Sequence, residues 1–104
     1  MTAFIDIVGS SGSSYRFRAV APDALPQSAG NFILVRHEDG QPRIVCSGAA
    51  NRLAEAAGVW RETVQQHDAQ AMFIYLNTTR RAREAVHADV VAASQPLVVA
   101  AHLD

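Results

Sequence analysis

A short run near the middle of the chain constrains its fold more than any other feature. Residues 43–53 begin as an apolar stretch, reach Gly48 and continue as an alanine-rich segment. The apolar stretch predicts a buried strand, and the alanine-rich segment after the glycine predicts a helix. A second apolar strand at 31–36 precedes this run across the turn residues Asp39 and Gly40. We therefore expect a β-hairpin that leads directly into a helix.

The N-terminal part of the chain predicts another hairpin. Residues 3–8 are rich in β-branched and aromatic side chains, which favour a strand. Residues 15–20 alternate apolar and arginine side chains, a pattern that is typical of a half-buried strand. The glycine- and serine-rich residues 9–14 separate them as a turn, so the hairpin covers residues 3–20. Pro22 and Pro26 then interrupt regular structure.

The second half of the chain alternates helices with extended segments. Gly58 is expected to end the first helix in a left-handed conformation, and Pro96 is expected to follow the last helix. The expected elements are helices at 49–57 and 59–67, a strand at 72–76, a helix at 80–94 and an extended segment at 97–100. This order predicts an α/β (α+β) fold, with a small antiparallel sheet flanked by helices.

Composition limits the possible functions. The chain has 104 residues, of which 49% are apolar, so we expect one domain over residues 1–104 with a true core. Its net charge of −1 argues against a dedicated duplex-DNA binder, which usually carries a basic excess. The single cysteine, Cys46, excludes an internal disulfide and a cysteine-based zinc site. Without a signal pattern or a long apolar run, we expect a cytoplasmic protein with no membrane contact.

The order of strand, turn, strand ending in glycine, helices and proline resembles the GIY-YIG nuclease domain. The resemblance covers about residues 30–100, and it includes Gly48, Leu53, Asp89 and Pro96. It implies a motif-bearing core at 30–100, to which the N-terminal hairpin is an addition. Because the matching positions are mostly structural, the resemblance concerns the scaffold rather than the chemistry.

In that family two tyrosines, an arginine and a glutamate activate water and bind phosphate and metal. The resemblance places these groups at Phe32, Cys46, Ala56 and His87, where none of the side chains can do equivalent chemistry. Phe32 has no hydroxyl, Ala56 has no guanidinium, and His87 is a poor ligand for magnesium. Glu84 lies one turn before His87 but lacks those partners. We therefore expect a vestigial apolar cleft shared by these residues, with no metal, no cofactor and no nuclease activity.

Arginine is concentrated at the start of the last expected helix. Arg80, Arg81 and Arg83 lie together there, although the helix dipole favours anions at that end. Their proximity favours a contact with phosphate or with an acidic partner, which Arg52 is expected to join. The alternative is a solvated face on which the arginines pair with nearby carboxylates such as Glu84.

Three functions from different classes remain open. We favour a catalytically inactive GIY-YIG-like domain that acts as a binding or regulatory module for a protein partner or for itself. The extended segment Leu97–Ala101 would suit this function by adding to the edge of a sheet. The first alternative is a weak nucleic-acid-binding protein that uses the arginine cluster. The second is an enzyme whose site is rebuilt around Cys46 and His87.

Overall fold

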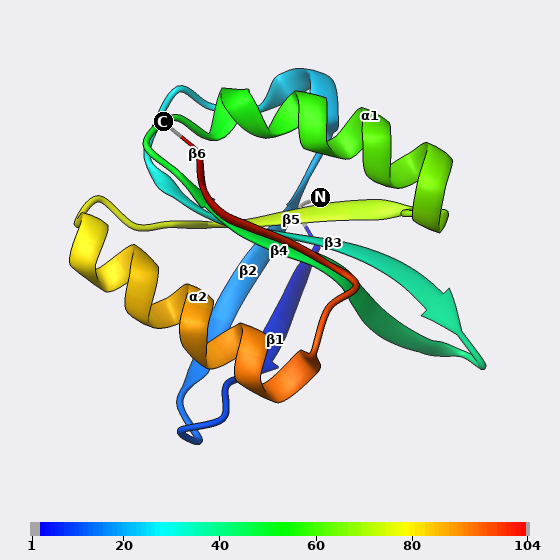
Figure 1. Ribbon diagram of the computed structural model, residues 1–104, viewed down its shortest axis with the longest axis horizontal. Coiled ribbons are helices and arrows are strands. Elements are labelled where there is room, and N and C mark those ends of the chain that lie inside the picture. Colours follow the sequence, from blue (N-terminus) through cyan, green and yellow to red (C-terminus); the bar gives the residue numbers. More distant parts are fainter. Residues whose placement is uncertain (1–2, 104) are drawn as a thin grey trace.

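A computed structural model describes residues 3–103, so positions 1–2 and 104 of the expected domain lie outside the described residues. Within this range the fold is mixed α+β: six strands form one curled sheet, and an α-helix covers each face (Figure 1). The strands are β1 (Phe4–Val8), β2 (Ser14–Val20), β3 (Gly30–Glu38), β4 (Gln41–Ala50), β5 (Ala71–Leu76) and β6 (Val98–Leu103). The helices are α1 (Ala56–His67) and α2 (Arg80–Ser94), and short 3-10 turns occupy Pro22–Ala24 and Leu53–Glu55.

The strand order across the sheet is β1-β2-β5-β3-β4-β6. Neighbouring strands are antiparallel except for β4 and β6, which run parallel because α2 carries the chain back to the starting end of β4. The central strand β3 pairs with β4 on one side and with β5 on the other, so Phe32 lies opposite both Gly48 and Ile74. The two edges of the sheet are β1 and β6.

Both expected hairpins are confirmed, and their turns follow from their residues. In the β3–β4 turn, Asp39 and Gly40 have φ values of 54° and 79°. Two consecutive left-handed residues form the type of tight turn whose twist matches the flanking strands. The β1–β2 hairpin turns at Gly12, whose φ is 90°. Glycine has no Cβ to oppose these conformations.

Residue Asp89 joins the first hairpin to helix α2. Its carboxylate accepts hydrogen bonds from the Tyr15 hydroxyl at 2.6 Å and from the backbone nitrogen and hydroxyl of Ser11 at 2.7 Å each. These hydrogen bonds hold the pKa of Asp89 below its usual value, and the bond from Tyr15 has the largest effect. The N-terminal hairpin is therefore fixed against the rest of the molecule rather than hanging free.

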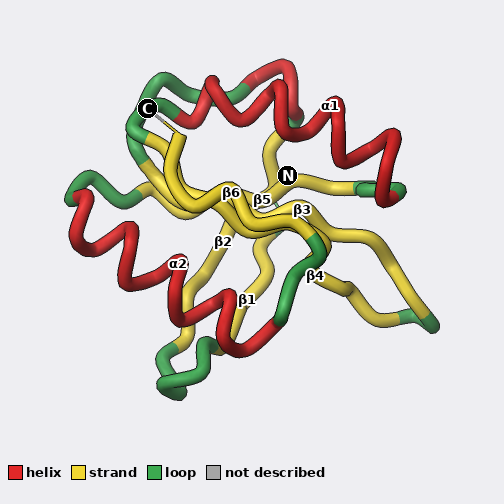
Figure 2. Tube along the Cα trace, viewed as in Figure 1, coloured by secondary structure: helices red, strands yellow, loops and turns green. Residues whose placement is uncertain are grey.

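Alternate residues along the central strands build two separate cores, one on each face of the sheet. Figure 2 shows the two helices on opposite sides of the strands. Under α1 lie Phe32, Leu34, Cys46, Met72 and Ile74, with Trp60 and Val64 of the helix packed against them. Under α2 lie Phe17, Ile33, Val35 and Ile44, together with Val86 and Val90 of the helix. A one-residue bulge at Val45 shifts the β3–β4 register, so that Leu34 pairs with Cys46 and Val35 pairs with Ile44.

The first helix differs from the sequence expectation. Ala49 and Ala50 extend β4, and α1 begins only at Ala56 and passes through Gly58. Asp68, with a φ of 56°, takes the left-handed position that ends the helix. Tertiary packing overrides the helix propensity of the alanines, because both are fully buried in a strand that pairs with β3 and β6.

The remaining elements agree with the sequence. Helix α2 has the expected bounds, β5 and the first part of β6 lie where extended segments were expected, and residues 59–67 are helical as part of α1. None of the helices in residues 3–103 is long and apolar enough to cross a membrane.

Candidate functional site

The residues aligned with the family's catalytic groups do not form one cleft. Phe32, Cys46 and Ala56 do come together, but they do so inside the core beneath α1, where each has zero exposure. Phe32 and Cys46 lie on adjacent strands, as the alignment requires. The expectation of a shared surface is nevertheless wrong, because closely packed core side chains cannot contact a substrate.

The fourth aligned residue, His87, and its neighbour Glu84 lie on the opposite face of the sheet. His87 is on α2, and its Nδ1 lies 3.3 Å from the Oγ of Ser47. Since successive side chains of a strand point to opposite faces, Ser47 points toward α2 while Cys46 points toward α1. Glu84 is exposed and forms an ion pair with Arg80 at 3.1 Å. The sheet therefore separates Cys46 from His87.

Burial also makes Cys46 chemically inert. Removal from water raises the pKa of the Cys46 thiol to about 12. At neutral pH the group is therefore a protonated thiol, whereas catalysis and metal binding require the thiolate. The Cys46–His87 enzyme site expected as an alternative lacks both a short contact and an activated nucleophile.

The arginine cluster at the start of α2 divides into an exposed part and a buried part. Arg80 and Arg81 are exposed, but Arg83 retains only 3% of its surface and points into the protein. Arg52 is exposed and pairs with Glu55. The expectation that Arg83 contacts a partner is therefore wrong, because its guanidinium cannot reach a phosphate without opening the fold.

Arg83 is instead the centre of a polar cluster between α2 and the sheet. We call it the Arg83 cluster; it consists of Asn31, Ser47, Asn51, Asn77, Thr78, Arg83, His87 and His102. The Arg83 Nη1 donates to the carbonyl oxygens of Thr78 at 2.8 Å and Asn77 at 3.1 Å. Its Nη2 donates to Asn51 Oδ1 at 2.6 Å, and its Nε lies 3.4 Å from His102 Nε2. One side chain thus joins α2 to the segment before it, the end of β4 and β6.

Asn31 extends this cluster into the middle of the sheet. It is 2% exposed, and its Nδ2 donates to the backbone oxygen of Arg83 at 2.9 Å. Its Oδ1 accepts from Asn77 Nδ2 at 3.3 Å. A buried amide is stable only when its donors and acceptors are paired, and Asn31 meets that condition on both sides.

The Arg83 cluster holds a buried positive charge with neutral acceptors. Among the described residues, no carboxylate forms an ion pair with Arg83. Its charge is stabilised by carbonyl dipoles and by the His102 imidazole, whose Nε2 lies 3.4 Å from Arg83 Nε. Arg83 and Asn31, which link these groups, are 3% and 2% exposed. The cluster is therefore suited to fixing β6 and α2 in place rather than to binding a ligand.

A pH effect is expected from His87 at the edge of this cluster. Burial, and then the nearby His102, lower the pKa of His87 from its ordinary value of 6.5. As the pH falls through 6.5, the unfolded chain takes up this proton before the folded chain does. The stability that depends on neutral His87 is thus present above pH 6.5 and is lost as the pH falls below it.

Urea denaturation at several pH values between 7.5 and about 5 tests this expectation. The loss of stability on acidification should be smaller in His87→Gln than in the parent chain. His37→Gln, at an exposed position on β3, is the matched control and should keep the parent's pH dependence. An unchanged slope in His87→Gln would show that this group does not govern the effect.

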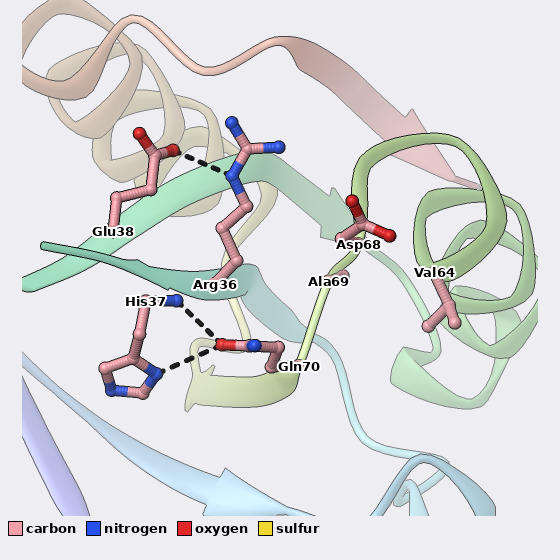
Figure 3. Close-up of a pocket in the computed structure, with 7 residues that line it drawn as sticks. All are labelled: Arg36, His37, Glu38, Val64, Asp68, Ala69 and Gln70. Carbon is pink, nitrogen blue, oxygen red and sulfur yellow. Dashed lines mark hydrogen bonds and ion pairs between the residues drawn. The ribbon is translucent and has the colours of Figure 1, made fainter. Parts of the chain in front are cut away.

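A surface hollow of about 730 Å³ lies elsewhere, between the end of α1 and strand β3 (Figure 3). Its polar groups bind one another. Arg36 Nε pairs with Glu38 Oε2 at 2.7 Å, and Gln70 Oε1 accepts from the backbone nitrogen of His37 at 2.7 Å. Arg36 also donates to the carbonyl oxygen of His67. These interactions within the protein occupy the polar groups of Arg36, Glu38 and Gln70.

Two further observations bear on the candidate site. Residues 3–103 contain no group of three or more His, Cys, Asp and Glu side chains placed to hold a metal ion. Comparison of the chain with models of protein families, with curated proteins and with solved structures finds no match.

Proposed function

We propose that this chain is a protein-binding module built on a degenerate GIY-YIG-like scaffold, and that it does not cleave nucleic acid. The order of elements from β3 to β6 supports this proposal, since a hairpin, a helix, a strand and a second helix follow one another as the alignment requires. The adjacency of β3, β4 and β5 also supports it. In this proposal the β1–β2 hairpin is the addition that extends the sheet.

The single observation that carries the proposal is the burial of Phe32, Cys46 and Ala56. All three have zero exposure and belong to the same core beneath α1. Phosphodiester cleavage needs polar groups that face a substrate and hold an activated water and a cation. Positions that the family uses for that chemistry are used here for core packing. This difference favours a binding function over cleavage.

Nucleic-acid binding is the weaker alternative. Because Arg83 is buried, the exposed arginines at the start of α2 are Arg80 and Arg81, and Arg80 pairs with Glu84. Arg52 likewise pairs with Glu55, and the chain as a whole has a net charge of −1. Because phosphate neutralisation supplies most of the affinity for duplexes, so small a set of free positive charges favours a protein partner.

A cleavage assay and a binding assay test this function. With Mg²⁺ or Mn²⁺ present, we expect no cleavage of plasmid DNA, branched DNA or RNA, and no duplex binding at physiological salt. The Arg80→Ala/Arg81→Ala variant should behave identically in both assays. Metal-dependent cleavage that is lost in Glu84→Ala or His87→Ala would overturn the proposal.

A retention experiment distinguishes the two binding alternatives. Tagged chain bound to beads should retain the same protein partner, including untagged chain, before and after nuclease treatment of a native lysate. Loss of every retained protein on nuclease treatment would instead favour nucleic acid as the direct ligand. Salt-dependent binding of purified duplex, flattened by the Arg80→Ala/Arg81→Ala changes, would support the same alternative.

A further inference from the structure

Strand β6 forms one open edge of the sheet. It pairs with β4 on one side and is the last strand in the sheet order (Figure 2). An edge strand presents a row of backbone N–H and C=O groups that another strand can pair with. Leu97 and Val99, at the start of this segment, are 51% and 50% exposed.

We propose that a second copy of this chain occupies this edge, through antiparallel pairing of the two β6 strands into one continuous sheet. This inference rests on the proposed function and names the partner. It commits to a symmetric contact in which Ala101 lies on the two-fold axis and faces its own copy. The small side chain of Ala101 leaves room for Val99 of each copy to pack beside it on the same face.

Charge distinguishes β6 from the other edge. Soluble proteins protect exposed edges with charged residues or proline, yet Val98–Leu103 contains neither Lys, Arg, Asp, Glu nor Pro. Strand β1 carries Asp6 at its centre, so a symmetric β1 pair would place two carboxylates opposite each other. Strand β6, whose one titratable side chain is His102, meets no such carboxylate repulsion from its own copy, and this difference favours β6 over β1.

The edge is also held in position before any contact forms. The backbone nitrogen of Asn51 donates to the oxygen of Leu103 at 3.0 Å, and Arg83 binds His102 from the helix side. The α1-side core includes Val98, Ala100 and Leu103 among its partly buried members. A strand fixed in this way loses little conformational freedom on binding, which favours association.

Sedimentation velocity over a range of concentrations tests the proposal. The parent chain should show a reversible monomer–dimer equilibrium. Val99→Lys/Ala101→Lys, which places two charges on exposed positions of β6, should weaken the dimer by about a hundredfold or more. Val8→Lys, at an exposed position on the opposite edge, is the matched control and should dimerise as the parent does.

Cross-linking provides a second measurement that does not depend on the lysine variant folding. Under mild oxidation, Ala101→Cys should form a disulfide-linked dimer, because the two-fold axis brings this residue close to its own copy. Ser14→Cys, at an exposed position on β2, should remain monomeric. In both variants the native Cys46 is buried and does not compete.

Each possible result either supports or overturns the proposal. A parent chain that stays monomeric at all concentrations overturns self-pairing, while a nuclease-resistant protein partner would leave the proposed function standing. A dimer that is unaffected by the lysine changes, with no Ala101→Cys cross-link, places the contact elsewhere. A monomer whose heterologous partner is lost with the lysine changes shows that β6 takes a strand from another protein.

Discussion

Replacing Arg83 with methionine is expected to lower the free energy of unfolding by about 3 kcal/mol. Methionine has a similar length but no donors, so the carbonyl oxygens of Asn77 and Thr78 and the amide oxygen of Asn51 would lose their partner. Urea denaturation monitored by circular dichroism measures the change. The bonds that fix His102, and therefore β6, would be lost in the same variant.

Arg81→Met is the matched control for this prediction. Arg81 belongs to the same turn of α2 but is exposed, so its replacement should change stability by less than about 0.5 kcal/mol. Arg83→Lys should recover only part of the loss, because an ammonium group cannot supply the planar set of donors that these acceptors require. Equal stability of Arg83→Met and Arg81→Met would show that the buried guanidinium contributes nothing to the fold.

A second large loss of stability is expected from Gly48→Ala, about 2 kcal/mol or more. A Cβ atom at this position would lie 2.3 Å from Phe32 Cζ and 2.9 Å from the backbone oxygen of Ala100. Phe32 is fully buried and cannot move aside without displacing the core beneath α1. Thermal and urea unfolding measure the effect.

Gly58→Ala provides the opposite expectation on the same chain. A Cβ there would meet only the end of the Arg61 side chain, at 3.7 Å, and the residue lies within α1. Alanine should therefore stabilise the helix by about 0.5–1 kcal/mol. If both alanine variants changed stability in the same direction, the close packing of β4 against Phe32 would not be the cause.

Local sequence signals were sufficient for most of the strands and for one helix. The Asp39–Gly40 pair locates the β3–β4 turn, and Pro96, just beyond the end of α2, marks where that helix stops. These signals work because turn geometry and helix ends depend on neighbouring residues alone. Strand order and the parallel β4–β6 pair depend on distant contacts, and no local pattern specifies them.

The alanine-rich segment shows where local reasoning fails. Ala49 and Ala50 have high helix propensity. Both are nevertheless buried in a strand that pairs with β3 on one side and with β6 on the other, and this pairing overrides the propensity. Gly58 was expected to end a helix that in fact continues through it to His67. Propensity describes an isolated segment, whereas pairing with β3 and β6 decides the conformation of Ala49 and Ala50.

One feature of the sequence indicates that Arg83 points inward. Arg83 lies three and seven residues before Val86 and Val90, on the same stripe of α2 that faces the sheet. That periodicity predicts an inward side chain, whereas the neighbouring arginines indicated a surface cluster. The acceptors that make its burial tolerable come from the chain at Asn51, Asn77 and His102, which only the tertiary fold brings together.

The parallel pairing of β4 with β6 has a consequence for the order in which the chain folds. Cys46 pairs with Val98, about fifty residues later, whereas each hairpin closes over a few residues. A contact that spans so much chain carries a larger loop-closure entropy and has to wait for α2 to form and turn back. The β2–β5 pair spans a similar length of chain, from Val20–Met72 to Arg18–Ile74, so both junctions are expected to close after the hairpins. Until β6 pairs with it, the free edge of β4 is exposed and can pair with a wrong strand.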